Sequence, residues 1–253
     1  MYLVHTGRIN LLRLLSSAAR VAEVGVFRGE FSQKLMEFLH PDELVLVDKW
    51  ELNKSAMFRE NITPRHMKDV SAAFSAYFQG DPEEVFRQAF EAVVNWSRDN
   101  PKVRILRKDS VLAARDFPDG YFDVIYVDAS HFYESVLADL YEWGTKLKRG
   151  GLLICNDFYE SAIGARQNLG VIPAVSTFMK RQGFVPVAVS AMPFSDAYLT
   201  NDPQSEQVRS FTSAIIVSAF PKVKLPSEAL LAFHHDIHVV DGKQIKVPSL
   251  SLQ

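Results

Sequence analysis

A glycine-containing turn near the N-terminus most strongly limits what this chain can fold into. The turn lies within residues 21–31, which read VAEVGVFRGEF, and a helical pattern begins directly after it. Gly25 can adopt the positive φ that other residues avoid, and Gly29 allows close packing against a ligand or neighbouring backbone. The next helix offers free N–H groups and the positive end of its dipole. The pattern therefore fits either a cofactor loop or an ordinary strand-to-helix turn.

The turn does not match the dinucleotide fingerprint G-x-G-x-x-G. Phe27 occupies the position of the middle glycine, which lets the backbone approach a pyrophosphate in that motif. A turn with so few glycines suits a cofactor that lacks a pyrophosphate. This observation argues against a nicotinamide-dependent oxidoreductase.

Apolar runs and helical patterns alternate from the N-terminus to about residue 190. Hydrophobic periodicity predicts strands at residues 20–24, 43–47, 103–107, 122–127 and 152–155. Helices are expected at residues 8–17, after the glycine turn, and at 82–100, 133–148 and 172–181. This alternation predicts an α/β fold with a doubly wound, Rossmann-like, mostly parallel sheet.

The remaining segments alternate less regularly. We expect a strand at 184–189, a polar loop at 193–209 and a last strand at 211–219, with the two strands forming an antiparallel hairpin. A single domain is expected over residues 1–220, with a helical insertion at about 49–80 that covers a site. Residues 221–253 form a C-terminal tail that wraps the domain or reaches a partner subunit, and a homodimer is plausible.

Composition excludes several classes of protein. The formal net charge of −2 gives no basic stripe for nucleic-acid binding. The single cysteine, Cys155, excludes an intramolecular disulfide framework and fits a reducing compartment. No apolar run is long enough for a membrane span, and the N-terminus does not resemble a signal peptide. We therefore expect a cytoplasmic protein without a membrane or nucleic-acid partner.

Polar residues follow the predicted strands at the same end of each strand. Asp48 follows the second strand, and Asp109 and Ser110 follow the third. In doubly wound sheets, ligands bind beyond the carboxyl ends of the strands. The coincidence of these positions with the glycine turn predicts one binding crevice at that edge.

The fourth and fifth strands end in a second group of polar residues. Asp128 ends the fourth strand, His131 follows three residues later, and Asn156 and Asp157 end the fifth. Adjacent parallel strands lie about 4.8 Å apart, so the carboxylates can converge. Oxygen ligands of this kind suit Mg²⁺, which gives a predicted metal site at Asp128, Asn156 and Asp157. His131 is then the candidate base that accepts a proton from a bound hydroxyl.

The turn resembles motif I of the class I methyltransferases, which bind S-adenosylmethionine. This resemblance implies cofactor contacts at Glu23, Gly25, Phe27, Gly29 and Asp128. It also assigns Asp48 to the ribose hydroxyls, and Asp109 and Ser110 to the adenine edge.

The stretch from Glu23 to Asp157 is similar to the macrocin and mycinamicin sugar O-methyltransferases. That resemblance implies Mg²⁺, a histidine base and methylation of a hydroxyl on a sugar or other small molecule. The chain departs from the macrolide group at Asn156, where an acid is expected. Candidates for the substrate wall are Trp50, His66, Tyr133 and Arg166.

Three functions remain open from the sequence. The first is a metal-dependent O-methyltransferase, and the second is a metal-independent methyltransferase in which Asp128 and Asp157 only bind substrate. The third is a non-catalytic binding module on the same fold, since fold alone does not decide function.

Overall fold

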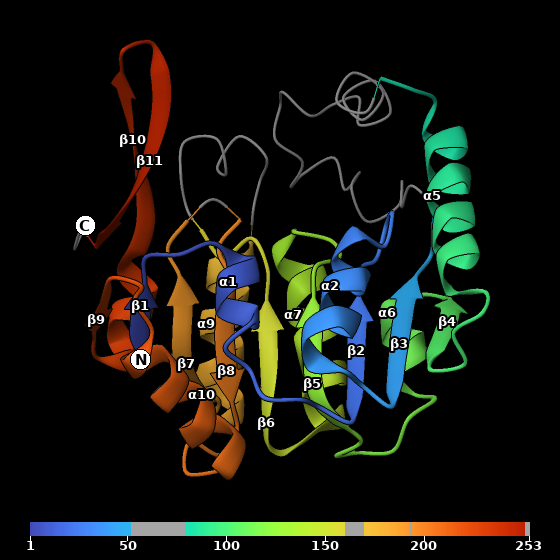
Figure 1. Cartoon of the computed structure of the whole chain (residues 1–253), viewed down its shortest axis with the longest axis horizontal. Helices are drawn as coiled ribbons and strands as arrows, with labels where there is room; N and C mark the ends of the chain where they lie inside the picture. Colours follow the sequence, from blue (N-terminus) through green and yellow to red (C-terminus); the bar gives the residue numbers. More distant parts are fainter. Residues whose placement is uncertain (52–78, 160–169, 193, 251–253) are drawn as a thin grey trace.

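A mostly parallel sheet with helices on both faces forms the body of the molecule (Figure 1). The structure, a computed structural model, describes residues 1–51, 79–159, 170–192 and 194–250. Most of the predicted insertion at 49–80 lies outside these residues. Among them, no helix is long and apolar enough to cross a membrane.

The described strands form a nine-stranded sheet in the order β4-β3-β2-β5-β6-β8-β7-β1-β9. Their bounds are β1 Tyr2–Val4, β2 Arg20–Val24, β3 Glu43–Asp48, β4 Val103–Arg107, β5 Phe122–Val127, β6 Leu147–Cys155, β7 Val185–Ser190, β8 Ala197–Thr200 and β9 Lys222–Lys224. Strands β4, β3, β2, β5 and β6 run parallel, whereas β8 is antiparallel to both β6 and β7. The predicted α/β fold is confirmed.

Helices cover both faces of the sheet and enclose two apolar cores. One core lies under α1, α2, α5 and α10, and the other under α6, α7 and α9. The bounds of the helices are α1 Arg8–Leu12, α2 Glu30–Leu39, α5 Pro82–Ser97, α6 Ser110–Ala114, α7 Tyr133–Lys146, α9 Val171–Gln182 and α10 Glu206–Val217. Strands β3 and β5 are almost wholly buried, as is usual for central strands of a parallel sheet, whereas the edge strand β4 is only partly buried.

The prediction of a last strand at 211–219 is wrong. These residues belong largely to α10, which begins after the N-cap Ser205, whose side chain accepts from Val208 N–H. Val208, Phe211 and Ile215 are buried at helical spacing. The antiparallel strand is instead β8, which lies inside the segment expected to be a polar loop, and it pairs with β7.

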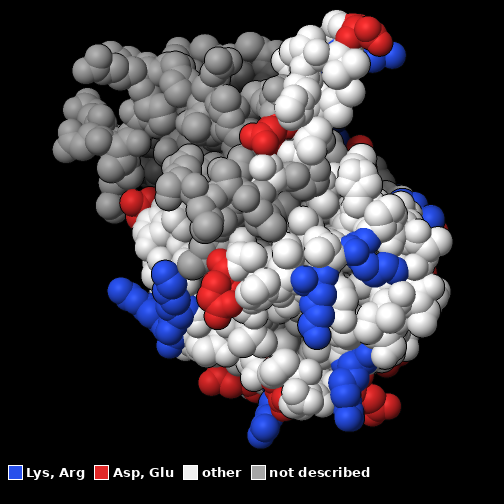
Figure 2. Space-filling model, turned by 90° about the vertical axis from the view of Figure 1, so that its left-hand side faces the viewer, with Lys and Arg blue, Asp and Glu red and all other residues white. Residues whose placement is uncertain are grey.

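The C-terminal segment contributes to the sheet and then leaves it. Strand β9 pairs antiparallel with β1, a strand that the periodicity did not predict. After the 3₁₀ helix η2 (Ser227–Ala232), strands β10 (Phe233–Val240) and β11 (Lys243–Leu250) form a separate two-stranded hairpin. The hairpin projects from the body (Figure 1). On this side of the molecule, charges of both signs are interspersed (Figure 2).

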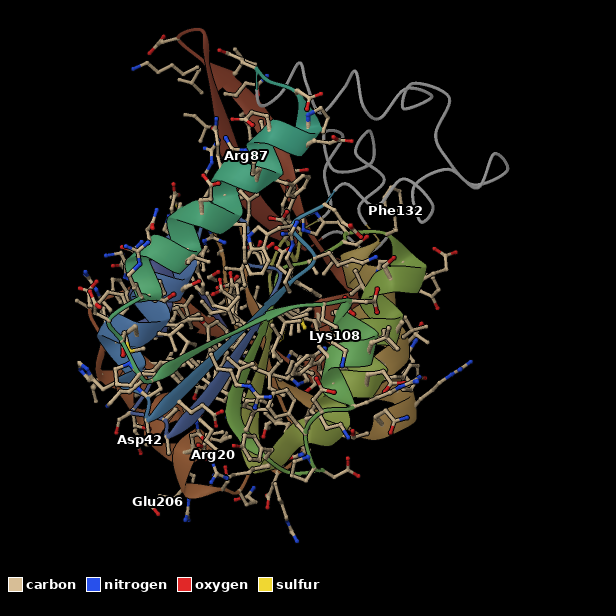
Figure 3. All side chains as sticks on the ribbon, turned by 90° about the vertical axis from the view of Figure 1, so that its right-hand side faces the viewer. Arg20, Asp42, Arg87, Lys108, Phe132 and Glu206 are labelled. Carbon is tan, nitrogen blue, oxygen red and sulfur yellow. The ribbon has the colours of Figure 1, made fainter. Side chains whose placement is uncertain are left out.

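The loops after the carboxyl ends of the parallel strands meet at one edge of the sheet. Phe132, which follows β5, lies at the opposite end of the molecule from Arg20 and Glu206 (Figure 3). The predicted site residues at the ends of β2, β3, β5 and β6 are therefore on the same edge.

Candidate active site

Gly25 lets two loops of the site approach each other. Its φ is +88°, and a Cβ at this position would lie 2.1 Å from the carbonyl oxygen of Asp128. The amide of Asp128 also donates to the carbonyl of Val24, at 2.7 Å. The predicted positive φ is confirmed, and the neighbouring backbone proves to be the loop after β5. The ends of β2 and β5 are thus fixed against each other.

The turn continues through two more residues in the left-handed region. Phe27 has φ +50°, which is rare for a residue with a side chain. Gly29 has φ +74°, and a Cβ there would lie 2.9 Å from the Val93 side chain of α5. The second glycine therefore serves the packing of the turn against α5.

Asp48 holds the glycine turn in place. Its Oδ2 accepts from the amides of Val26 and Phe27, both at 2.9 Å, and its Oδ1 accepts from the amide of Trp50 at 2.7 Å. Trp50 in turn donates its indole N–H to the carbonyl of Phe27 at 2.7 Å. The sequence did not reveal this role, and the ribose contact of Asp48 stays a prediction.

Glu23 is a buried acid beneath the turn. It is 1% exposed and accepts a hydrogen bond from the hydroxyl of Ser32 on α2. Burial raises the pKa of Glu23 well above its usual value, and the negative charges of Asp128 and Asp48 raise it further. Both effects disfavour the charged form of the carboxyl group.

The end of β4 holds the pair assigned to adenine. The carboxylate of Asp109 caps α6 by accepting from the amide of Leu112 at 3.3 Å, and it lies 3.8 Å from Nζ of Lys49. Ser110 donates its hydroxyl to Asp139 of α7. Burial raises the pKa of Asp139 to about 7. Adenine binding by Asp109 and Ser110 stays a prediction.

His131 lies between two carboxylates that come from different strand ends. Its Nε2 is 3.4 Å from Oδ1 of Asp128, and its Nδ1 is 3.4 Å from Oδ2 of Asp157. Burial lowers the pKa of His131, but the hydrogen bond to Asp128 and the charges of Asp157 and Asp128 outweigh burial and raise the pKa above its usual 6.5. The structure thus brings together three predicted site residues.

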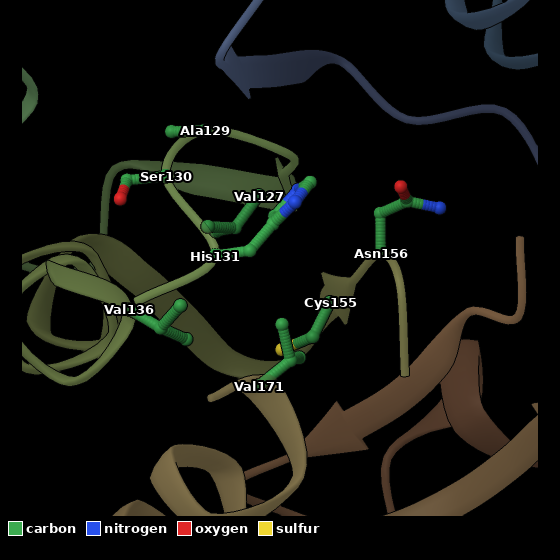
Figure 4. Close-up of a pocket in the computed structure, with 8 residues that line it drawn as sticks. All are labelled: Val127, Ala129, Ser130, His131, Val136, Cys155, Asn156 and Val171. Atoms are coloured by element: carbon green, nitrogen blue, oxygen red, sulfur yellow. The ribbon is translucent and has the colours of Figure 1, made fainter. Parts of the chain in front are cut away.

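A pocket opens beside the histidine (Figure 4). The side chain of His131 extends toward the end of β6, where Asn156 lies. The lining residues are Val127, Ala129, Ser130, His131, Val136, Cys155, Asn156 and Val171. The cavity encloses about 10 Å³, which is room for about one water molecule, between an apolar wall and the imidazole ring.

The backbone at Asp157 is strained. Its φ is +51°, in the left-handed region that residues with side chains seldom adopt. Such strain concentrates at functional sites, because the surrounding structure must hold it. The strain sits in the residue whose carboxylate contacts Nδ1 of His131.

The predicted magnesium ligands do not form a shared ion site as they lie. The imidazole ring of His131 separates the carboxylates of Asp128 and Asp157. Asn156 directs its amide nitrogen to Asp196, at 2.8 Å. Among the residues that the structure describes, no three His, Cys, Asp or Glu side chains are arranged to hold a metal ion. These residues therefore do not fit Mg²⁺ without rearrangement.

A polar network beside the site was missed from the sequence. Asp196, immediately before β8, is fully buried and accepts from the hydroxyl of Tyr126 at 3.1 Å as well as from Asn156. Burial raises the pKa of Asp196 to about 7. Arg8 of α1 donates to the same Tyr126 hydroxyl at 3.1 Å and lies 3.5 Å from Asp128. No motif marks these residues, since they come from segments far apart in the sequence.

The residues predicted to line the substrate site lie in different environments. Trp50 is 1% exposed and packs against Phe90, so it belongs to the core. Tyr133 is partly buried, and its hydroxyl lies 3.2 Å from that of Thr177. His66 and Arg166 lie outside the described residues.

A family model described as a methyltransferase domain matches residues 22–158, from β2 to the loop after β6. This match spans more than half of the 253 residues. The chain belongs to the methyltransferase-domain family. The matched segment contains the glycine turn, Asp48, the Asp128–His131 loop and Asp157. A search of curated proteins found no match.

Solved structures share the fold at low sequence identity. The N-methyltransferase NodS from Bradyrhizobium japonicum is 14% identical with a TM-score of 0.50, and the match covers 76% of this chain and 93% of NodS. Spermidine synthase from Thermotoga maritima is also 14% identical, with a TM-score of 0.48 and 81% of this chain covered. The match covers only 59% of the synthase. The likeness to NodS supports the class I methyltransferase fold.

Proposed function

We propose that this protein transfers the methyl group of S-adenosylmethionine to a hydroxyl group of a small metabolite, with His131 as the base. The observation that carries the proposal is the position of His131 between Asp128 and Asp157, on the edge where the glycine turn ends. The family match supports methyl transfer. NodS, which shares the fold, has also been solved with S-adenosylhomocysteine.

The glycine turn and the adjoining strand ends are proposed to hold the cofactor. Glu23 lies near the end of β2, and Gly25, Phe27 and Gly29 lie in the turn after it. Asp48 fixes that turn through two of its backbone amides. Asp109 and Ser110 lie at the start of α6, beside β4. The sulfonium of the bound cofactor supplies an electrophilic methyl group, so the protein needs to provide an aligned nucleophile.

Asp157 is proposed to orient the imidazole through Nδ1, and this leaves Nε2 to accept the proton. Both ring contacts, Nδ1 to Asp157 and Nε2 to Asp128, are 3.4 Å long, which is longer than an ordinary hydrogen bond. An acceptor hydroxyl can therefore replace Asp128 as the partner of Nε2. Apo geometries of catalytic hydrogen bonds are often loose in this way. His131 would take the hydroxyl proton as the acceptor oxygen bonds to the methyl carbon, while the S–CH3 bond breaks and S-adenosylhomocysteine leaves as the other product.

This arrangement supports a metal-independent reaction over the magnesium-dependent one that the family resemblance implies. In it, the histidine and its two carboxylates provide proton transfer without a cation. We expect turnover to survive incubation with EDTA and to gain nothing from added Mg²⁺. Loss of turnover in EDTA that Mg²⁺ restores would instead support a rearranged metal site.

The test is methyl transfer from radiolabelled S-adenosylmethionine to a panel of sugars, polyols and phenols. Calorimetry with S-adenosylhomocysteine is run in parallel. We expect cofactor binding and label transfer to at least one hydroxyl compound. A protein that folds but binds neither cofactor form would contradict the proposal. Cofactor binding without transfer to any compound of the panel would favour the binding module.

A further inference from the structure

Arg8 reaches the site from outside the segment that the family model matches. It is the first residue of α1, and its Nη1 donates to the hydroxyl of Tyr126 in β5 at 3.1 Å. The same nitrogen lies 3.5 Å from Oδ2 of Asp128, whose other oxygen contacts His131. Arg8 therefore stands next to the proposed base, on the other side of Asp128.

Two aromatic rings fix the position of the Arg8 guanidinium. Its Cζ lies 4.8 Å from the centroid of Phe31 on α2 and 5.7 Å from that of Phe194, between β7 and β8. Both distances are within the range of cation–π contacts. The side chain is 28% exposed, so its charged end is held but not enclosed.

The guanidinium keeps its charge and has unused donors. Burial lowers the pKa of Arg8, but Tyr126, Asp196 and Asp128 outweigh this effect and raise it. Of its five N–H donors, only those of Nη1 have hydrogen-bond partners among the described residues. The contact with Asp128 is also longer than the 2.7–2.9 Å typical of charge-assisted hydrogen bonds. Nε and Nη2 therefore remain available to a ligand.

We propose that Arg8 binds a carboxylate or phosphate group of a ligand in this crevice. A planar guanidinium fork matches either anion with two parallel hydrogen bonds. Phe31 and Tyr126 pre-orient the fork, so little entropy is lost on binding. The anion has two possible sources, the carboxylate of the cofactor and an acidic group of the methyl acceptor. This inference rests on the proposed function.

Calorimetry with two cofactor analogues separates the sources. S-Adenosylhomocysteine carries the amino-acid carboxylate, whereas 5′-methylthioadenosine lacks it. Both are titrated into the wild-type protein and into the Arg8→Gln and Arg8→Lys variants. Inorganic phosphate is then titrated into each protein after loading with S-adenosylhomocysteine. The matched control is Arg13→Gln, since Arg13 stacks on Phe38 of the same helix α2 at 4.6 Å.

If the cofactor supplies the anion, Arg8→Gln weakens S-adenosylhomocysteine binding about tenfold or more and leaves methylthioadenosine binding unchanged. If the acceptor supplies it, cofactor affinity is unchanged and phosphate binding to the loaded protein is lost. In either case Arg8→Lys gives a smaller loss, because it keeps the charge without the fork. Arg13→Gln has no effect on any of these titrations.

Unchanged binding of all three ligands in Arg8→Gln would overturn the role of Arg8 and leave the proposed function intact. An equal loss in Arg13→Gln would also overturn it, since the effect would then come from the packing of α1 on α2. A wild-type protein that binds neither S-adenosylhomocysteine nor methylthioadenosine would overturn the proposed function itself. The two failures are therefore distinguishable.

Discussion

At the scale of single residues, the site depends on backbone contacts that only particular side chains allow. Gly25 permits the carbonyl of Asp128 to approach closely, and Asp48 accepts two backbone amides of the turn. Each contact joins the end of one strand to that of another. Small changes at these residues should therefore alter cofactor binding and stability together.

Replacing Gly25 with alanine should destabilise the protein by about 3 kcal/mol or more, since the new Cβ meets backbone and the residue keeps a positive φ. Gly183→Ala is the matched control. Gly183 has φ +70°, but no atom lies within 4 Å of its Cβ position. Gly183→Ala should therefore lower the free energy of unfolding by only about 1 kcal/mol. Urea unfolding measures both, and equal losses would show that the close approach to Asp128 does not matter.

Turnover should rise with pH to a plateau, with a midpoint above 6.5, because the base must be neutral and the pKa of His131 is raised. Asp157→Asn removes one of the two negative charges that raise it. The midpoint of kcat against pH should therefore fall in this variant. A midpoint that does not move would separate Asp157 from the ionisation that controls catalysis.

The buried acid Asp139 makes stability depend on pH. Burial raises the pKa of Asp139 from 3.8 to about 7. Between pH 4 and pH 7 the carboxyl group is therefore protonated in the folded state and ionised in the unfolded state. Stability from this group is therefore full below pH 4 and falls as pH rises to 7. In Asp139→Asn, the difference in unfolding free energy between pH 5 and pH 8 should shrink by about 2 kcal/mol. Urea titrations at both pH values would detect it, and an unchanged difference would contradict the assignment.

At the scale of elements, hydrophobic periodicity predicted the bounds of the first strands of the parallel sheet accurately. The strands β2, β3, β4 and β5 lie within one residue of their expected bounds, because each is a short, mainly apolar segment bounded by polar residues or glycine. The wrong prediction at 211–219 arose because an apolar run there suits either a strand or a helix. Its helical spacing became clear only with the N-cap at Ser205. Strand β8 has only four residues, too few for an alternation to stand out.

The hairpin β10–β11 should unfold independently of the rest. Among the described strands, β10 and β11 pair only with each other, from Phe233↔Leu250 to Val240↔Lys243, and Val239 is 69% exposed. Isolated two-stranded hairpins are marginally stable. Truncation after Ala232 should therefore change the unfolding free energy of the main domain by less than about 1 kcal/mol. Urea unfolding followed by tryptophan fluorescence would detect a larger loss, which would show that the hairpin supports the domain.

At the scale of the whole molecule, the site combines parts that are far apart in the sequence. The strand-end residues could be predicted because the topology of a parallel sheet brings its carboxyl ends together. The separation of Asp128 and Asp157 by the ring of His131 could not be predicted, since it depends on how side chains lie in two loops. The contribution of Arg8 and Asp196 also could not be predicted, because the segments that carry them meet only through the order of the strands in the folded sheet.

The most direct test of the account is the rate of methyl transfer by the His131→Ala variant, measured with an acceptor found in the panel. The account predicts that kcat falls at least about 100-fold, as expected on losing a general base, while the KM values for both substrates change little. A kcat equal to that of the wild-type protein would contradict it.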